Sequence, residues 1–332
     1  MPTLVQVAIC TDNMPRTIRT FVEVLGFDSA GGRPRWGERA SRLQELGTGD
    51  NSYTMIWWLI GRQGFGGQVE LFHHSSPAQR PRPEGWTPAD LGWTRFGVVV
   101  PDFDAVVARL AAADHATLSD PIEVNGFRRV CFREPGSDVV VEIMEEDPAL
   151  PAAESGTADP RPALAYVAAS VRDLDEFRRQ FTEVLGLEEL PADTIHGPGA
   201  EQLWGLAEAR REVAVFDGGG VLLEAVRYDD PTPRPPADDA LLSDQGLMNI
   251  AMGYRDHVVM HDDVEGTLSR GATASVEVPT TSGSTYLRLA DRLSVEMLVV
   301  PPGLDEHFGY VPQELAPPGN DFAPRRDRGP RR

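Results

Sequence analysis

The chain contains 332 residues, of which 41% are hydrophobic, and this length is sufficient for two domains of ordinary size. Its formal net charge of −20 argues against nucleic acid and against an anionic membrane surface as partners. All 31 basic residues are arginine, which excludes a lysine Schiff base and a lysine general base.

Other features of the composition favour a reducing compartment. The sequence has no run of about 18 apolar residues that could span a membrane, and its start lacks the basic and apolar regions of a secretory signal. The two cysteines, Cys10 and Cys131, have no CxxC partner, which argues against a disulfide framework or a structural zinc site. We therefore expect a cytoplasmic protein that binds a small molecule. Its assembly is left open, with a homodimer as one alternative.

Strands and helices are predicted in the same order four times along the chain. The first unit has apolar alternation and then helical spacing, followed by further strands, in the segments 4–11, 14–27, 53–60 and 68–74. The second unit repeats this order in the segments 96–102, 103–114 and 128–145. The third and fourth units follow in the segments 164–173, 174–187, 211–227, 248–256 and 284–300. Each is a βαβββ unit, so the predicted fold class is α+β.

Polar, proline-rich segments separate these units. The segment 148–162 lacks apolar periodicity and is predicted to link a first domain, 1–147, to a second domain, 163–316. Shorter breaks of the same kind fall inside each half. The tail 317–332 is polar, basic and rich in proline, and it is expected to be disordered.

A polar residue and a glutamate mark fixed places in every unit. An acidic or amide residue follows each first strand at a fixed distance: Asn13, Asp102, Asp173 and Asp256. Each last strand contains one glutamate: Glu70, Glu142, Glu224 and Glu296. The spacing within each half is the same, since 142 − 70 and 296 − 224 both equal 72, and this indicates a duplicated unit. A carboxylate in a buried strand needs compensation. We expect Glu70 and Glu142 to share one cavity, and Glu224 and Glu296 to share another.

The repeated helices carry a resemblance to a known family. The segments NMPRTIRTFVEVLGF and DLDEFRRQFTEVLGL are similar to the helix ending in Leu-Gly-Phe of the vicinal oxygen chelate superfamily. That superfamily includes glyoxalase I, extradiol dioxygenases and bleomycin-resistance proteins. The resemblance covers nearly the whole chain as four units. It implies two tandem glyoxalase-like open-barrel domains, each with a cavity in which a divalent metal ion is held by residues of the first and last strands of the units.

In the first half, the resemblance points to the ligand positions Gln6, Glu70, Arg95 and Glu142. The glutamine and the two glutamates are similar to a glyoxalase-I set. Arg95 cannot ligate a metal, because it stays protonated, and we expect it to point inward and to form a forked ion pair with Glu70 or Glu142. This group of four residues would then bind substrate. In the alternative, it contains a structural ion pair in a site that has lost its metal and its function.

In the second half, the corresponding positions are Tyr166, Glu224, Asn249 and Glu296. Two close carboxylates either bind a cation or share a proton, which raises the pKa of one of them. Glu224 and Glu296 are therefore the predicted acid/base pair, or the ligands of a metal ion if one is present. Tyr166 and Asn249 would position an oxygen atom of the substrate. In the alternative, water or neighbouring amides satisfy the two carboxylates. Neither half has the His-His-Glu set of the extradiol dioxygenases.

Aromatic and histidine side chains add candidates for substrate binding. One ring of the Trp57–Trp58 pair should enter the first cavity, with Trp57 as the candidate. His74 shares a strand face with Glu70, although such histidines more often end a strand at the surface. His196 stands in a loop that could cover the second cavity, yet a lone loop histidine is usually solvated.

Two functions of different class follow. The leading interpretation is an enzyme of the lyase, isomerase or oxygenase kind that acts on a small oxygenated metabolite, with a divalent metal ion left open as cofactor. The alternative is a non-catalytic protein that sequesters a small cationic antibiotic or metabolite, as in bleomycin resistance. The charge of −20 and the aromatic residues near the cavities favour this alternative.

Overall fold

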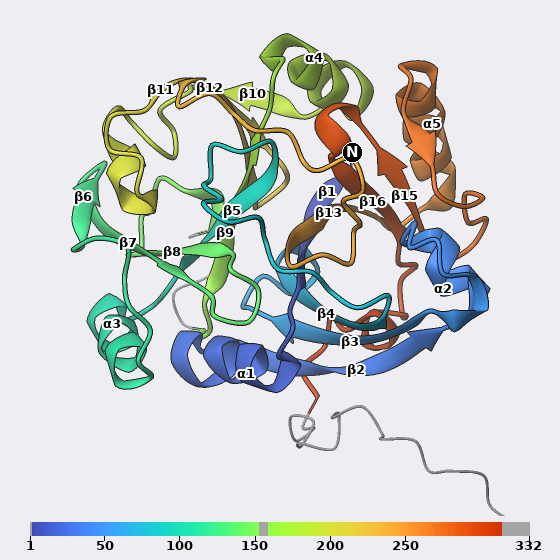
Figure 1. Cartoon of the computed structure of the whole chain (residues 1–332), viewed down its shortest axis with the longest axis horizontal. Coiled ribbons are helices and arrows are strands. Elements are labelled where there is room, and N and C mark those ends of the chain that lie inside the picture. Colours follow the sequence, from blue (N-terminus) through green and yellow to red (C-terminus); the bar gives the residue numbers. More distant parts are fainter. Residues whose placement is uncertain (1, 153–158, 314–332) are drawn as a thin grey trace, which may run out of the picture.

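The computed structural model describes residues 2–152 and 159–313, and these contain two eight-stranded sheets with helices packed on their outer faces (Figure 1). The first sheet has the strand order β14-β15-β16-β13-β1-β4-β3-β2, and the second has the order β10-β11-β12-β9-β5-β8-β7-β6. Each sheet combines two βαβββ units, so the fold is α+β with two glyoxalase-like open barrels, as predicted. The predicted tail, 317–332, lies outside the described residues, as does part of the predicted linker.

The first and fourth units form the first sheet. The strands of the first unit are β1 (Thr3–Cys10), β2 (Asp28–Trp36), β3 (Tyr53–Ile60) and β4 (Gln68–Ser76). Its helices are α1 (Met14–Arg19), which continues as a π-helical turn over Thr20–Leu25, and α2 (Glu38–Leu43), with short 3₁₀ turns at Gly49–Asn51 and Gly64–Gly66. The fourth unit contains β13 (Gly246–Tyr254), α5 (His257–Ser269), β14 (Thr273–Ala274), β15 (Gly283–Arg288), the turn Ala290–Arg292, β16 (Ser294–Val299) and the turn Glu306–Phe308.

The second and third units form the second sheet. The second unit contains β5 (Gly92–Val99), α3 (Phe103–Ala112), β6 (Ile122–Val124), β7 (Phe127–Arg133) and β8 (Val140–Met144). The third contains β9 (Ala163–Ser170), α4 (Leu174–Arg178) with a π-helical turn at Arg179–Val184, β10 (Glu188–Leu190), the 3₁₀ turn Ala200–Trp204, β11 (Arg210–Asp217) and β12 (Leu222–Asp230).

The polar residue that recurs after each first strand is a helix N-cap. The side chain of Asn13 accepts a hydrogen bond from the backbone N–H of Arg16, and Asp102 accepts one from Ala105 at 2.9 Å. The equivalent aspartates of the third and fourth units cap α4 and α5 in the same way. A side-chain oxygen at this place satisfies a backbone N–H that has no partner within the helix. The fourfold pattern therefore encodes helix starts.

The pairing of the units corrects the sequence-based expectation. β1 pairs with β13 in antiparallel register from Thr3–Gly253 to Cys10–Gly246, and β5 pairs with β9. Figure 1 shows each of these pairs side by side within its sheet. The first unit thus shares a sheet with the fourth, and the second unit with the third. The predicted halves, 1–147 and 163–316, do not coincide with the sheets.

Two proline-rich arms, 77–91 and 231–245, cross between the sheets, because each arm runs from the last strand of one unit to the first strand of the next unit in the other sheet. Arg80 of the first arm donates two hydrogen bonds to Asp244 at 2.9 and 2.7 Å. Arg234 of the second arm donates two to Asp90 at 2.9 and 2.6 Å. Both pairs are forked, which fixes geometry as well as charge. The two arms are thus bonded to each other, and each connects two units that lie in different sheets, the first with the second and the third with the fourth.

Alternation along the strands separates two buried layers. Val7 and Ile9 of β1 pack with Phe21 in the large core between helices and sheets, whereas Ala8 and Cys10 face the concave side. Gln6 shares the alternation of Ala8 and therefore faces the concave side as well. No helix among the described residues is long and apolar enough to cross a membrane.

Candidate functional site

The two concave faces are related by an internal duplication. The offsets 224 − 70, 296 − 142 and 249 − 95 all equal 154, so positions in the first sheet have counterparts in the second. Glu70 corresponds to Glu224, and Glu296 corresponds to Glu142. The structure brings Glu142 together with Glu224, and it brings Glu70 together with Glu296. The expected cavity partners, Glu70 with Glu142 and Glu224 with Glu296, are therefore wrong.

A closed cluster fills the second sheet. The ring of His196 lies between the two carboxylates, with Nε2 2.9 Å from Glu142 and Nδ1 2.8 Å from Glu224, and all three side chains are fully buried. The ring therefore bridges the two carboxylates through both of its nitrogens. Tyr166 also donates its hydroxyl to Glu142 at 2.5 Å.

Two buried arginines complete the closed cluster. Arg95 points inward as expected, but its partner is Glu224, and its guanidinium stacks 3.8 Å from the ring centre of Trp204. Arg129 donates to the carbonyl of Ile195 at 2.8 Å and lies 3.4 Å from Glu142. The expected partners of Arg95, Glu70 and Glu142, are both incorrect, because β5 pairs with β9 of the third unit.

The charges in the closed cluster hold both glutamates in the ionised form. Burial alone would raise the pKa of Glu142, but His196, Arg129 and the Tyr166 hydroxyl together lower it to about 2. Burial also opposes ionisation of Glu224, and His196 and Arg95 reverse this and lower its pKa. Glu224 is therefore not an acid/base group at neutral pH.

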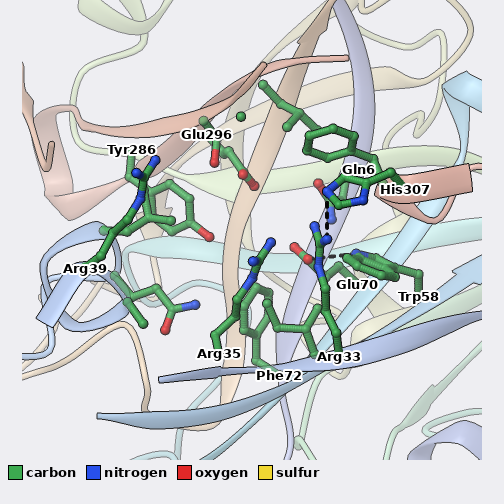
Figure 2. A pocket seen from close by; sticks show the side chains of 18 of the residues that line it. Gln6, Arg33, Arg35, Arg39, Trp58, Glu70, Phe72, Tyr286, Glu296 and His307 are labelled. Atoms are coloured by element: carbon green, nitrogen blue, oxygen red, sulfur yellow. Dashed lines mark hydrogen bonds between the residues drawn. The ribbon is translucent and has the colours of Figure 1, made fainter. Parts of the chain in front are cut away.

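An open cavity of ≈ 370 Å³ occupies the concave side of the first sheet (Figure 2). Gln6, Glu70 and Glu296 line it, together with the aromatic side chains Trp58, Phe72, Tyr286 and Phe308. Asn249 of β13 is fully buried, and it lies close enough to Tyr286 to affect the pKa of that phenol. In the closed cluster, by contrast, the His196 ring lies between the paired glutamates.

The two glutamates of the open cavity have pKa values shifted in the opposite direction from those of the closed cluster. Burial and the neighbouring Glu296 raise the pKa of Glu70 well above its usual range, although Trp58 Nε1 donates to it at 2.9 Å. Burial raises the pKa of Glu296 to about 7. One oxygen of Glu296 and the side-chain oxygen of Gln6 are buried without a hydrogen-bond partner in the described part of the chain. These oxygens are available to a ligand.

Three arginines and a histidine surround the same cavity. Arg33 and Arg35 of β2, Arg39 of α2 and His307 all line it, and Figure 2 shows the three arginines around the glutamates. Arg33 donates to Nε2 of His307 at 2.9 Å and stacks 4.9 Å from the ring centre of Trp58.

Solved structures identify the fold. No family model and no curated protein matches the sequence. A candidate dioxygenase from Bacillus subtilis is similar over 92% of this chain and 89% of its own, with a TM-score of 0.61 and 14% identity. Glyoxalase I from Zea mays is similar over 90% of this chain and 92% of its own, with a TM-score of 0.60 and 14% identity. The chain has the vicinal oxygen chelate fold.

The vicinal oxygen chelate fold implies a metal ion, and the two concave faces differ in whether they fit one. In the closed cluster, the His196 ring already lies between Glu142 and Glu224, and Arg95 pairs with Glu224, so that site does not fit a metal. Among residues 2–152 and 159–313, no cluster of three His, Cys, Asp or Glu side chains could hold a metal ion. The open cavity offers oxygen donors only. Gln6, Glu70 and Glu296, two of which have an unpartnered oxygen, fit a hard divalent cation or a shared proton.

The vicinal oxygen chelate positions therefore divide between two places. Gln6, Glu70, Asn249 and Glu296 belong to the first sheet, and Arg95, Glu142, Tyr166 and Glu224 belong to the second. Glu224 and Glu296 cannot hold one metal ion together, because each pairs with a different glutamate. Tyr166 donates to Glu142 within the closed cluster and does not reach Asn249 or the open cavity.

Two predicted substrate-binding residues lie elsewhere. Trp57 packs in the core and donates to Ser29 at 3.1 Å, and its neighbour Trp58 lines the cavity instead. His74 is buried and bonds to Thr54 at 2.8 Å without lining the cavity. Burial lowers the pKa of His74 to about 3, so it stays neutral.

Several residues of the two sites escaped the sequence analysis. His196 was expected to be solvated, yet it is the centre of the closed cluster, and no sequence signal marks it. Arg129 of β7 was missed for the same reason. Arg33 and Arg35 had a readable signal, because two arginines at i and i+2 in a strand share one face.

Proposed function

We propose that the open cavity is the active site of an enzyme that transfers a proton on a small oxygenated molecule, in a lyase or isomerase reaction. The observation that carries this proposal is the buried pair of Glu70 and Glu296, with the pKa of Glu296 raised to about 7. A general acid or base works best when its pKa lies near the operating pH. The closed cluster has no such group, because both of its glutamates remain ionised.

The chain's own residues support a simple division of roles. Glu296 in its ionised form would accept a proton from a carbon atom next to an oxygenated carbon, and in its protonated form it would return the proton to a neighbouring position. Glu70 stays protonated or shares that proton, which keeps the two carboxylates from repelling each other. Trp58 holds Glu70 through its Nε1 hydrogen bond. In place of that proton, a divalent cation could be held by Gln6 and Glu70, and it would polarise the substrate oxygen when bound.

The other sequence-based interpretations have less support. Iron-dependent ring cleavage requires imidazole ligands, and the four positions in the first sheet are two glutamates, a glutamine and an asparagine. Sequestration of a cationic ligand rested on the net charge of −20 and on aromatic residues near the cavities; aromatic side chains do line the open cavity, but so do three arginines. The field inside the cavity, and not the average over the molecule, decides which ligand is attracted.

Hydrogen exchange from carbon tests the proposal. Wild-type protein in D₂O is incubated with a panel of small 2-oxo, 2-hydroxy and epimerisable carboxylic acids, and deuterium incorporation is followed by proton NMR. We expect incorporation into at least one compound, and loss of that exchange in Glu296→Gln. The matched control is Glu142→Gln, at the duplicated position in the closed cluster, which should keep the exchange while circular dichroism shows that it is folded. Equal exchange rates in wild type and Glu296→Gln would refute the assignment.

A further inference from the structure

Three arginines at the open cavity have no acidic partner. Among residues 2–152 and 159–313, no salt bridge joins Arg33, Arg35 or Arg39 to a carboxylate, although the chain has 51 acidic and 31 basic residues. Elsewhere, some exposed arginines, such as Arg80, Arg128 and Arg234, are paired with aspartate or glutamate, and others, such as Arg42, have no salt bridge among the described residues. Arg33, Arg35 and Arg39 differ from these because all three line one cavity, where an anion could neutralise them together.

The local fold builds these arginines into one group. A bulge in β2 between Ser29 and Gly32 brings the strand against β3, where a Cβ on Gly32 would lie 2.3 Å from the carbonyl oxygen of Ile56. Arg33 and Arg35 then face the cavity by alternation. Gly37 has a φ of 83°, which turns the chain sharply into α2 and brings Arg39 to the same opening.

Arg33 is held in place and is destabilised as a cation. Its contacts with His307 and the Trp58 ring fix the guanidinium, and its Nε is buried without a partner in the described residues. Burial and the neighbouring Arg35 lower the pKa of Arg33 to about 10, and Glu70 only partly opposes this. Burial and then Arg33 also lower the pKa of His307, consistent with a neutral ring that accepts the Arg33 hydrogen bond. An anion in the cavity would relieve the repulsion between these groups.

The duplicated position in the second sheet lacks this group. The strand that corresponds to β2 is β10, Glu188–Leu190, which follows the repeated Leu-Gly motif as β2 does but has only three residues, so it ends before the positions that correspond to Arg33 and Arg35. Positive charge at the mouth is therefore a property of the open cavity and does not come from the βαβββ unit itself.

We propose that the substrate carries an oxyanion group, a carboxylate or a phosphate-type group, which binds to Arg33, Arg35 and Arg39 while the reacting carbon lies at Glu296. This inference rests on the proposed function, since it names the substrate class of the same cavity. Guanidinium groups bind carboxylate and phosphate oxygens through paired, charge-assisted hydrogen bonds. The volume of ≈ 370 Å³ limits the substrate to a small molecule.

Isothermal titration calorimetry at constant ionic strength tests the oxyanion site. The probes are malonate, inorganic phosphate and, as a cation of similar size, choline. We expect saturable 1:1 binding of malonate or phosphate and none of choline, and the stronger of the two anions identifies the head group. Arg33→Gln and Arg35→Gln should each weaken binding roughly tenfold or more, because each removes charge-assisted hydrogen bonds.

The control is Arg42→Gln, which removes an exposed arginine of the same helix, α2, that does not line the cavity. It should bind the anion like the wild type. Binding of choline in preference to both anions, no binding of either anion, or unchanged anion affinity in both Arg33→Gln and Arg35→Gln would each overturn the inference.

The result separates this inference from the proposed function. Glu296→Gln should retain anion binding, because it removes no cation, while it loses hydrogen exchange. Anion binding by wild-type protein without any hydrogen exchange would support the oxyanion site and refute the proton-transfer role of Glu296. Hydrogen exchange that continues in Arg33→Gln with an unchanged KM would support proton transfer and refute the oxyanion site.

Discussion

Replacing Arg95 with methionine should strongly destabilise the protein. The Arg95 side chain and its partner Glu224 are both 0% exposed, so the substitution leaves a buried carboxylate that has lost its arginine partner. Breaking a buried ion pair from one side costs about 3–5 kcal/mol. The guanidinium also loses its stacking on Trp204, but methionine retains part of that contact area. We expect a decrease of about 3–5 kcal/mol in the free energy of unfolding.

Urea unfolding followed by circular dichroism measures this change. The control is Arg210→Met in β11, where the arginine is 74% exposed and lies 3.8 Å from Asp230; exposed pairs of this kind contribute at most about 1 kcal/mol. The double variant Arg95→Met with Glu224→Gln should recover part of the loss, because it also removes the unpaired charge. A loss below about 1 kcal/mol in Arg95→Met, or no recovery in the double variant, would refute the account of the closed cluster as a network of compensated charges.

Three further predictions concern the two glutamate sites. Burial raises the pKa of Glu296 from 4.5 to about 7, so the stability that this carboxyl contributes is present below pH 4.5 and is lost as the pH rises through 7. In urea titrations, the free energy of unfolding of the wild type should therefore decrease relative to that of Glu296→Gln between pH 5 and 7. A difference between the two proteins that does not change with pH would contradict the shift. Trp58→Phe removes the hydrogen-bond donor to Glu70 and should further raise the pKa of that carboxyl, which would change the pH dependence of hydrogen exchange. Trp57→Phe, which loses a hydrogen bond to Ser29 on the other strand face, should leave that pH dependence unchanged. His196→Ala removes the ring that bridges two buried carboxylates and should lower the free energy of unfolding in urea by about 3–5 kcal/mol. Malonate binding in calorimetry should stay within twofold of wild type. A loss of malonate binding in folded protein would show that the two sites are coupled.

The sequence contained the elements of the fold but not their pairing. Each unit could be recognised because helix caps such as Asn13 and Asp102 and the strand glutamates are local signals, and they recur at fixed spacing. The spacing of 72 between Glu70 and Glu142 cannot decide pairing, since duplicated units keep the same spacing whichever unit each one packs against. The pairing is seen only in the tertiary structure, where contacts such as Arg80 with Asp244 join positions 164 residues apart.

For the candidate site too, the sequence indicated single residues but not which residues lie together. Glu70, Glu296 and Gln6 were identified from the sequence as positions in a cavity, because a polar residue inside a buried strand is a local feature. Their chemistry depended on which other side chains reach them. His196 comes from a loop with no periodicity, and it turns Glu142 and Glu224 into a structural network. Trp58 and not Trp57 faces the cavity, a choice that strand register makes and composition cannot.

The sequence alone therefore determined the four βαβββ units and the α+β class, because these depend on periodicity and on neighbours a few residues away. Only the tertiary structure decided that one concave face is filled and the other open. The same residue type, glutamate, has a pKa of about 2 at position 142 and about 7 at position 296. Both are buried, and burial raises the pKa of both; the difference arises because His196, Arg129 and the Tyr166 hydroxyl outweigh burial at Glu142, whereas Ser284 and Arg35 offset it only in part at Glu296.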